Sequence, residues 1–337
     1  MSDARAPVQA AGGLTETVRA LTPDDAPEMR RLFELVFGHS MSPALWAWKY
    51  SDGRGHGVGL FRDGAMVAHY GGLTRRLRWC GQRVLACQVC DVVVQSSANR
   101  ALVRRGPLFQ VCTAFLQDQV GTDRPHPVAF GFPSARHHAV AHRLGLYDAV
   151  DHIVQLAWPA RPASPDRTTP CVHALAESGD FTPGEVAALD RLGLEMADDA
   201  LGSLIGVRDA EQWRQRYLRH PEVRYGLHLV RSRWWGIPLA AFVVRRHEGR
   251  LQLLDVVGAR RALPLAVQAA QALAAQHGLP VLDAWITASH AHWLDPCREA
   301  TRSDPEIPVP CNTWTPGPSA AELQGRWFLM AGDADFT

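Results

Sequence analysis

The sequence predicts an α+β protein with α/β character, built from two similar lobes that are each a mixed, mostly antiparallel sheet flanked by helices. Three kinds of segment recur in the same order in both halves of the chain. One is a strand ending in Asp-Val-Val, then a basic loop and a Pro-Leu helix start, and another is a strand leading through Ser and His into a helix. The third kind of segment has a Trp, a basic residue and a Tyr at the same spacing in both halves, in Trp46-Lys49-Tyr50 and Trp213-Arg216-Tyr217. In each half it precedes two short apolar strands. A shared order of several segments is hard to obtain by chance, so it indicates a duplication.

Length and composition agree with two globular lobes. The chain has 337 residues, of which 47% are hydrophobic and 20% charged, as in ordinary globular domains. The formal net charge of +1 gives no field that favours DNA or a membrane surface. No run of 18 apolar residues predicts a membrane span. The absence of an apolar signal core and the seven scattered cysteines favour the cytoplasm.

Composition along the chain suggests where the lobes begin and end. Residues 1–16 are expected to be a flexible tail and residues 17–159 the first lobe. Residues 160–170, rich in Pro, Ser and Thr, are expected to form a linker. Residues 171–337 would form the second lobe, and the oligomeric state stays open.

The first lobe begins with clear local signals. A short strand over residues 18–21 is followed by Thr22, a helix cap, and by a helix that ends at Gly38. Asp63-Gly64 is a strong hairpin turn between two apolar strands. In the motif at Trp46 we expect Trp and Tyr to be packing residues and the basic residue to be solvated or paired.

The stretch RVLACQVCDVVV is nearly all apolar, which indicates a central strand. Its Cys87 and Cys90 would point to opposite faces of a strand, so no metal site is expected there. After a polar loop, Gly106-Pro107 opens a helix, followed by a strand in HPVAFGF and a helix in PSARHHAVAHRLG. A helix start carries free amides and partial positive charge, which suit a phosphate or pyrophosphate. Arg104 and Arg105 just before it would add charge-assisted contacts.

This first half resembles the GNAT superfamily of acyl-CoA-dependent N-acyltransferases. The resemblance covers residue 18 to about residue 148. It rests on VRALTPDDAPEMRRLFELVFG, on DGAMVAHYGG as the hairpin, on DVVV as the fourth strand, and on FGFPSARHHAVAHRLG as the fifth strand and its helix. It implies acetyl-CoA or another acyl-CoA as co-substrate and an amine, on a small molecule or a peptide, as acceptor. No metal is implied.

The resemblance also implies where acyl-CoA would bind. In the family, a Q/R-x-x-G-x-G/A loop after the fourth strand holds the pyrophosphate at the next helix start, and the acyl-pantetheine lies between the fourth and fifth strands. Here the fourth position of that loop is Gly106, while Val103 and Leu108 replace its first and last residues. The expected CoA-binding residues are Val92, Val93, Val94, Arg104, Arg105, Gly106 and Leu108.

The catalytic expectations follow the same resemblance. The family often has an acidic residue on the fourth strand as general base, and Asp91 holds this place; a structural carboxylate that fixes the strand is the alternative. The family's general-acid Tyr falls on Ala141 here. Its neighbours His142 and His138, or Tyr147 after the helix, are expected to supply the proton instead.

The second half looks like a degenerate copy. Asp255 corresponds to Asp91 and Pro264 to Pro107, but the loop between them is shorter and offers only Gly258. The predicted function is direct acyl transfer to an amine in a ternary complex, with acyl-CoA in the first lobe and the second shaping the acceptor pocket. Two alternatives stay open, namely an aminoacyl transferase of the FemABX type, also built from two GNAT-like lobes, and a non-catalytic CoA-binding or scaffold protein.

Overall fold

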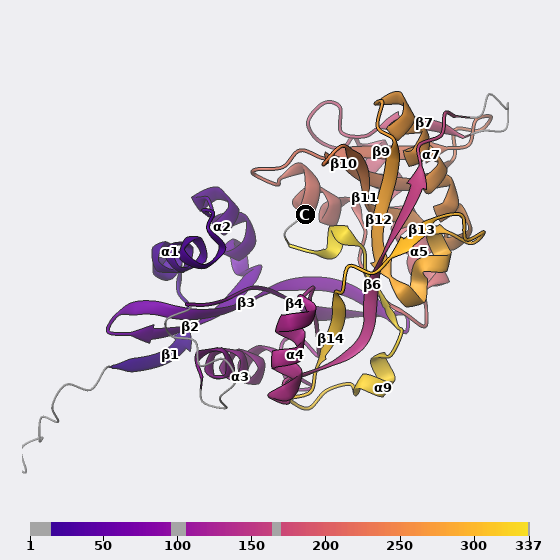
Figure 1. The fold of residues 1–337 in the computed structure, drawn as a ribbon. Coiled ribbons are helices and arrows are strands. Elements are labelled where there is room, and N and C mark those ends of the chain that lie inside the picture. The colour runs from indigo at the N-terminus through magenta and orange to yellow at the C-terminus, as the bar shows by residue number, and fades with distance from the viewer. Residues whose placement is uncertain (1–14, 96–105, 164–169, 336–337) are drawn as a thin grey trace, which may run out of the picture.

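The computed structural model describes residues 15–95, 106–163 and 170–335 of the chain and contains two sheets (Figure 1). Residues 1–14 of the expected tail, Arg104 and Arg105 of the expected CoA loop, and residues 164–169 of the expected linker lie outside the described residues. In the described part of the chain, no helix is both long and apolar enough to cross a membrane.

The first sheet contains the strands expected for the first lobe. Its order is β1-β2-β3-β4-β5, with β5 parallel to β4 and the other neighbours antiparallel. The strands are β1 (Glu16–Ala20), β2 (Gly55–Arg62), β3 (Ala65–Trp79), β4 (Gln82–Val94) and β5 (Val128–Phe130). The helices are α1 (Ala26–Phe37), α2 (Pro43–Tyr50), α3 (Pro107–Gln119) and α4 (Ala135–Arg143). Figure 1 shows α1 and α2 on one side of this sheet and α3 on the other.

Local signals in the sequence explain how these elements begin and end. Gly38 closes α1 in the left-handed conformation, with φ of 75°. Asp63 and Gly64 both have positive φ, which a tight hairpin between β2 and β3 requires, so the predicted turn is confirmed. Thr22 and Asp25 form a capping box at the 3-10 turn that leads into α1.

Asp25 is the centre of that cap, so we expect Asp25→Ala to lower the free energy of unfolding by about 2 kcal/mol. Its carboxylate accepts two 2.7 Å hydrogen bonds from Arg19 and one of 2.8 Å from the Thr22 amide. Hydrogen bonding to Arg19 lowers the pKa of Asp25 to about 2. The contribution is therefore present above the unfolded pKa of about 3.9 and lost as the pH falls towards 2.

Urea denaturation at pH 7 and at low pH measures this effect. The neighbouring exposed carboxylate provides the control, because Asp24→Ala removes the same charge without the cap. Equal losses in the two variants would contradict the assigned role of Asp25.

The second sheet has the order β13-β6-β12-β11-β10-β9-β7, and β14 also pairs with β6. Its strands are β6 (Tyr147–Pro159), β7 (Cys171–Ala174), β9 (Gly226–Arg231), β10 (Pro238–His247), β11 (Arg250–Gly258), β12 (Val281–Thr287), β13 (Thr301–Ser303) and β14 (Pro308–Asn312). Only β11 and β12 are parallel. The helices are α5 (Pro183–Asp199), α6 (Ala210–Trp213), α7 (Leu263–Gln276), α8 (Ala291–Leu294) and α9 (Ala320–Leu323). A π-helical turn over Arg214–Leu218 continues α6.

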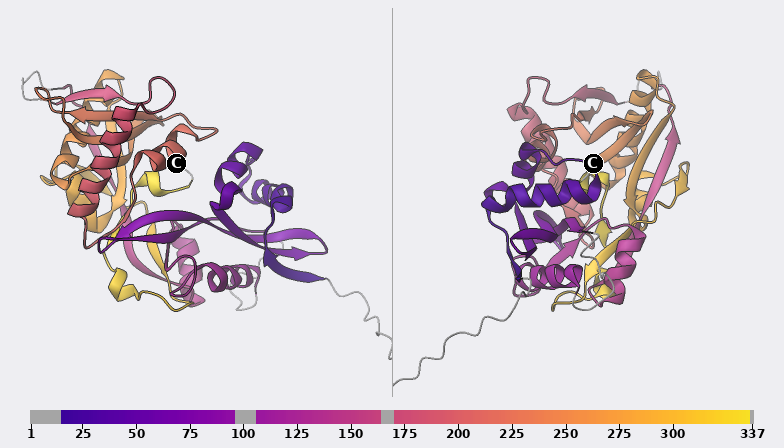
Figure 2. Two further views of the ribbon diagram at one scale, coloured as in Figure 1. Left: turned by 180° about the vertical axis from the view of Figure 1, so that it is seen from behind. Right: turned by 60° about the vertical axis from the view of Figure 1, so that its left-hand side comes forward.

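The two sheets exchange strands. β6 follows α4 of the first lobe but pairs with β12 in the second sheet. In return, β8 (Leu204–Gly206) pairs with the end of β3, and β15 (Trp327–Phe328) pairs with β8. The C-terminal segment then enters the space between the lobes (Figure 2). Residues from the end of the chain therefore reach the first sheet.

Candidate active site

The regular pairing of β4 breaks at Asp91. Gly71 of β3 faces Cys90, whereas His69 faces Val93, so the register shifts across Asp91 and Val92. Asp91 has φ of 49°, the left-handed region that few non-glycine residues adopt. On the other side, the pairing with β5 stops at Gln88 and Phe130 although β4 runs on to Val94. The strand is thus bulged where it has left β5.

The side chain of Asp91 is held by two residues of α2. Lys49 Nζ lies 2.9 and 3.2 Å from the two carboxylate oxygens of Asp91, and Tyr50 donates its hydroxyl to Oδ2 at 2.6 Å. His69 Nδ1 donates to the Asp91 carbonyl at 2.7 Å. The Lys49 and Asp91 side chains are only 5% and 3% exposed. Contacts to both the side chain and the carbonyl of Asp91 therefore stabilise its unusual backbone conformation.

A residue from the far end of the chain completes this cluster. Lys49 Nζ also lies 2.9 Å from Oδ2 of Asp335. Ligand-type atoms of Cys90, Asp91 and Asp335 come within 4.8 Å of one another, as they would around a metal ion. The Lys49 ammonium lies against both carboxylates, and Lys49 is the only lysine in the sequence. The Lys49 ammonium therefore supplies the positive charge that faces the carboxylates of Asp91 and Asp335.

Opposing effects set the charge state of the cluster. Burial alone would lower the pKa of Lys49, but the carboxylates of Asp335 and Asp91 outweigh it and raise the pKa above its ordinary value. Burial would raise the pKa of Asp91, yet the charge of Lys49 and the hydroxyl of Tyr50 bring it below its usual range. Burial and the nearby Asp91 raise the pKa of Tyr50. At neutral pH the ion pair is charged and the phenol is neutral.

The sequence does not predict Lys49 and Tyr50 as site residues, and for Asp335 it leaves two roles open, namely capping a sheet or lining the cleft between the lobes. The duplicated motif holds the missing signal, because it repeats the Lys/Arg and Tyr positions together with the Asp-Val-Val strand. Tyr217 reaches Asp255 with a 2.9 Å hydrogen bond, as Tyr50 reaches Asp91. The Tyr is therefore more than a packing residue, although Trp46 does stack on Tyr50 at 5.7 Å.

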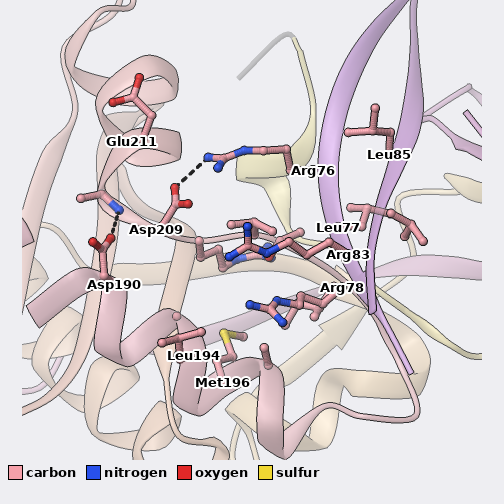
Figure 3. Close-up of a pocket in the computed structure, with 18 of the residues that line it drawn as sticks. Arg76, Leu77, Arg78, Arg83, Leu85, Asp190, Leu194, Met196, Asp209 and Glu211 are labelled. Carbon is pink, nitrogen blue, oxygen red and sulfur yellow. Dashed lines mark hydrogen bonds and ion pairs between the residues drawn. The ribbon is translucent and has the colours of Figure 1, made fainter. Parts of the chain in front are cut away.

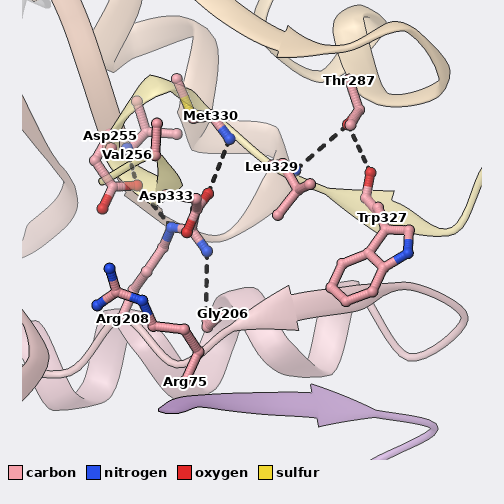
Figure 4. A network of polar contacts seen from close by, with 12 residues as sticks. Arg75, Gly206, Arg208, Asp255, Val256, Thr287, Trp327, Leu329, Met330 and Asp333 are labelled. Atoms are coloured by element: carbon pink, nitrogen blue, oxygen red, sulfur yellow. Dashed lines mark hydrogen bonds and ion pairs between the residues drawn. The ribbon is translucent and has the colours of Figure 1, made fainter. Parts of the chain in front are cut away.

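The second lobe repeats the cluster with a different cation (Figure 4). Arg208 Nε lies 2.6 Å from Asp255, and its Nη2 lies 2.7 Å from Asp333. Arg216, at the place of Lys49, donates instead to the carbonyls of Gly332 and Ala334 at 3.0 and 2.7 Å. Side chains of both clusters therefore contact the same C-terminal segment.

The expected CoA-binding residues lie along β4 and at the start of α3. Val93 and Val94 pair with β3, and Val92 is 36% exposed at the bulge. Gly106 is the N-cap of α3, and among the residues that the structure describes no side chain caps this helix start. Leu108, in the first turn, is half-buried. These positions leave the first-turn amides of α3 available to an anion.

The other three candidates form a separate group on α4 and β6. His142 Nδ1 lies 2.9 Å from the carboxylate of Asp148, and its ring stacks on His138 with centroids 6.2 Å apart. Tyr147 places its hydroxyl 3.7 Å from Cys112 Sγ on α3, and burial raises its pKa. Within the described residues, the hydrogen bonds and ion pairs found for this group lead to α3, α4 and β6, and none of them leads to Asp91.

A protein-family model matches most of the first lobe. Residues 17–148 match the model of the acetyltransferase (GNAT) domain. No curated protein matches the chain. This stretch coincides closely with the part of the chain whose sequence resembles the GNAT superfamily.

Solved structures identify the fold of the whole chain. A probable N-acyltransferase of unknown function from Enterococcus faecalis V583 is 10% identical, with a TM-score of 0.67 over 89% of this chain and 73% of that one. A GCN5-related N-acetyltransferase from Kribbella flavida is 18% identical, with a TM-score of 0.62 over 88% and 71%. Saccharomyces cerevisiae N-myristoyltransferase with bound myristoyl-CoA is 11% identical, with a TM-score of 0.54 over 96% and 90%. Residues 17–148 thus match a GNAT acetyltransferase domain, and the two sheets together make the tandem GNAT-like fold that the internal repeat predicts.

Proposed function

We propose that the protein transfers an acyl group, in the first instance acetyl, from acyl-CoA to an amine by direct attack in a ternary complex. The observation that carries this proposal is the break in β4 at Asp91, beyond the last pair with β5, within the GNAT domain. A strand that bulges and leaves its neighbour has backbone groups free to meet a ligand. Positioning of the two reactants would supply much of the rate.

The residues present fit an acyl-CoA. The uncapped first turn of α3, with the amides of Leu108 and Phe109, suits the pyrophosphate. Pro107 offers no amide, but that position has no intrahelical acceptor in any helix. Arg104 and Arg105 precede this turn in the sequence and would add charge. When bound, acyl-CoA supplies the activated thioester that the amine attacks.

Asp91 is proposed to act by positioning the bulge. Its carboxylate already accepts three hydrogen bonds and is nearly inaccessible, so it is poorly placed to take a proton from an amine. The rigid conformation at Asp91 would aim the amides of Val92 and Val93 at the oxyanion that forms on the acyl carbon.

His138, which the sequence analysis expects to supply a proton, is proposed instead as the proton acceptor. Its Nε2 is buried and has no hydrogen-bond partner among the described residues. Burial lowers the pKa of His138, so the ring is neutral at pH 7 and Nε2 can accept a proton. His142, which is 58% exposed, would pass protons to solvent. The hydroxyl of Tyr147 faces α3, so we propose that this residue orients α4 and β6.

The lobes would divide the work. The first lobe, residues 17–159, would hold acyl-CoA, and the second, residues 171–337, would shape the acceptor pocket. The exchange of β6, β8 and β15 between the sheets links the two lobes by strand pairing.

Thermal-shift titration with acetyl-CoA, longer acyl-CoAs and CoA is the first test. A ligand at about 100 times its Kd stabilises the folded state by about 2.7 kcal/mol, which corresponds to a rise in Tm of several degrees. No stabilisation by any of the three would refute the proposal. Stabilisation without acyl transfer to any amine in a panel of amino sugars, amino acids, polyamines and peptides would favour the scaffold alternative.

Matched variants of the two lobes test the site. Asp91→Asn is expected to lower kcat/KM for acyl transfer about 100-fold, because the bulge loses its ion pair. Asp255→Asn disturbs the corresponding cluster of the second lobe and should leave the acyl-CoA Kd unchanged. His138→Ala is expected to lower kcat by about 10²-fold or more and to remove the acid limb of the pH profile. Unchanged transfer in Asp91→Asn, His138→Ala and His142→Ala together would show that the site lies elsewhere.

A further inference from the structure

A pocket lies between the β3–β4 hairpin of the first lobe and α5, β8 and α6 of the second (Figure 3). It has a volume of about 580 Å³, which is within the range of small-molecule sites. One wall is the tip of the β3–β4 hairpin, and the other consists of α5, β8 and α6. Arg83 on this wall precedes Asp91 by eight residues of the same strand, about 26 Å at 3.3 Å per residue. The pocket is therefore separate from the proposed acyl-CoA site.

Positive charge without a partner gathers on the hairpin wall. Arg78 and Arg83 are directly opposite each other across the β3–β4 ladder, where like charges repel. Within residues 15–95, 106–163 and 170–335, neither has an ion pair. Arg78 makes only a 3.5 Å contact to the carbonyl of Gly81. Two neighbouring guanidinium groups are thus left open to the pocket.

The carboxylates that line the pocket are already engaged. Asp209 pairs with Arg76 at 2.8 Å, and Glu211 pairs with Arg214 at 2.9 Å. Asp190 accepts a 3.0 Å hydrogen bond from the backbone amide of residue 210. Asp209 and Glu211 are thus paired with other arginines, and Asp190 forms no ion pair with Arg78 or Arg83 among the described residues, so an external anion is favoured at this end.

Each wall also presents an accessible apolar side chain. Leu85 on the hairpin and Leu194 on α5 are 42% and 52% exposed although both line the pocket. Figure 3 shows Arg78 and Arg83 extending from the hairpin towards α5, where Leu194 and Met196 lie. An occupant would meet two cations and an aliphatic wall within one cavity.

We infer that this pocket binds an organic anion with an aliphatic body, whose carboxylate or phosphate contacts Arg78 and Arg83 while its chain lies against Leu85 and Leu194. Guanidinium groups form short, charge-assisted hydrogen bonds to either oxyanion. Binding would relieve the repulsion across the ladder and cover the exposed leucines. The inference is independent of acyl transfer and needs no acyl-CoA.

Calorimetric titration of the full chain with octyl phosphate and with octanoate tests this site. Both are expected to bind, and inorganic phosphate and octyltrimethylammonium are expected to bind at least 10-fold more weakly. Binding should persist with CoA at saturation, whether or not CoA itself binds. Equal binding of the cationic amphiphile, or loss of octyl phosphate binding when CoA is added, would overturn the inference.

Variants separate the two parts of the pocket. Arg78→Gln/Arg83→Gln is expected to weaken octyl phosphate binding at least 10-fold and to leave Tm without ligand equal or higher. Leu194→Ser should weaken octyl phosphate binding but not that of inorganic phosphate. Arg250→Gln, on the corresponding β10–β11 hairpin of the second lobe, is the matched control and should bind as wild type does. Unchanged binding in the double arginine variant would refute the assigned site even if acyl transfer is confirmed.

Discussion

Lys49→Met is expected to lower the free energy of unfolding by about 3–5 kcal/mol at pH 7, because it leaves the buried carboxylate of Asp91 and the largely buried one of Asp335 without their shared cation. The Lys49 ammonium lies 2.9 Å from a carboxylate oxygen of Asp91 and 2.9 Å from one of Asp335. Without it, a carboxyl group must take up a proton or the C-terminal segment must leave the first sheet. Urea denaturation of the wild type and the variant measures the loss. Acyl transfer should fall with it, since the bulge at Asp91 loses its support.

The loss should shrink as the pH falls. In the wild type, Lys49 offsets the effect of burial and holds the pKa of Asp91 below its usual range. That contribution is present above the unfolded pKa of about 3.9 and is lost as the pH falls through the folded pKa. In Lys49→Met, burial and the facing carboxylate would raise the pKa of Asp91 above its unfolded value. The variant would then regain stability as the pH falls through this raised pKa. An equal loss at pH 7 and pH 5 would contradict the ion-pair explanation.

Lys49→Arg distinguishes charge from shape. Lys49 is the only lysine in the sequence, and every other residue in the Lys and Arg count is an arginine. The use of lysine at this buried position therefore does not reflect the composition of the chain. A guanidinium is larger and planar, whereas the ammonium is a compact charge with three donors that can contact Asp91 and Asp335 together. We expect Lys49→Arg to recover little of the stability. Lys49→Met/Asp91→Asn should recover more, because it removes the stranded charge.

Local sequence signals predicted the turn and the strand that form the site. The contacts between side chains from distant parts of the chain were not predictable from such signals. The Asp63-Gly64 turn and the apolar run of β4 can be predicted from neighbouring residues alone, because turn chemistry and burial act locally. The contact of Lys49 with Asp335 spans 286 residues, and no periodicity links such positions. The duplication predicted that Asp91 and Asp255 are equivalent, but not that each has a Tyr and a cation as partners.

The exchange of strands between the two sheets could not be predicted from the sequence for a similar reason. No strand was predicted for β6, and even a recognised strand does not reveal its neighbour in the sheet: β6 pairs with β12 rather than with β5. Arg208 shows the same limit, because it reaches Asp255 from 47 residues away while Arg216 stands at the position of Lys49. A repeated motif therefore identifies a repeated cluster, while the side chain that neutralises it differs between lobes.

Arg208→Met is expected to cost about 3–5 kcal/mol in the free energy of unfolding, as large an effect as Lys49→Met but in the second lobe. Arg208 is buried and neutralises Asp255 and Asp333 at 2.6 and 2.7 Å. Its loss leaves both carboxylates with only neutral donors, such as Tyr217 and the Met330 amide. Arg208→Met/Asp255→Asn/Asp333→Asn should recover much of the stability, because replacing a whole buried ionic group is far less costly than removing one partner.

Comparison of Lys49→Met with Arg208→Met distinguishes an effect on the stability of the C-terminal segment from an effect on catalysis. Asp333 and Asp335 lie two residues apart on the segment that both clusters hold, so each variant should loosen it and increase hydrogen exchange at its backbone amides. Only Lys49 touches the bulge of β4, so kcat for acyl transfer should fall much further in Lys49→Met than in Arg208→Met when both are assayed folded, at a temperature well below their Tm. Equal losses of kcat would mean that the C-terminal segment, rather than the conformation at Asp91, limits the reaction.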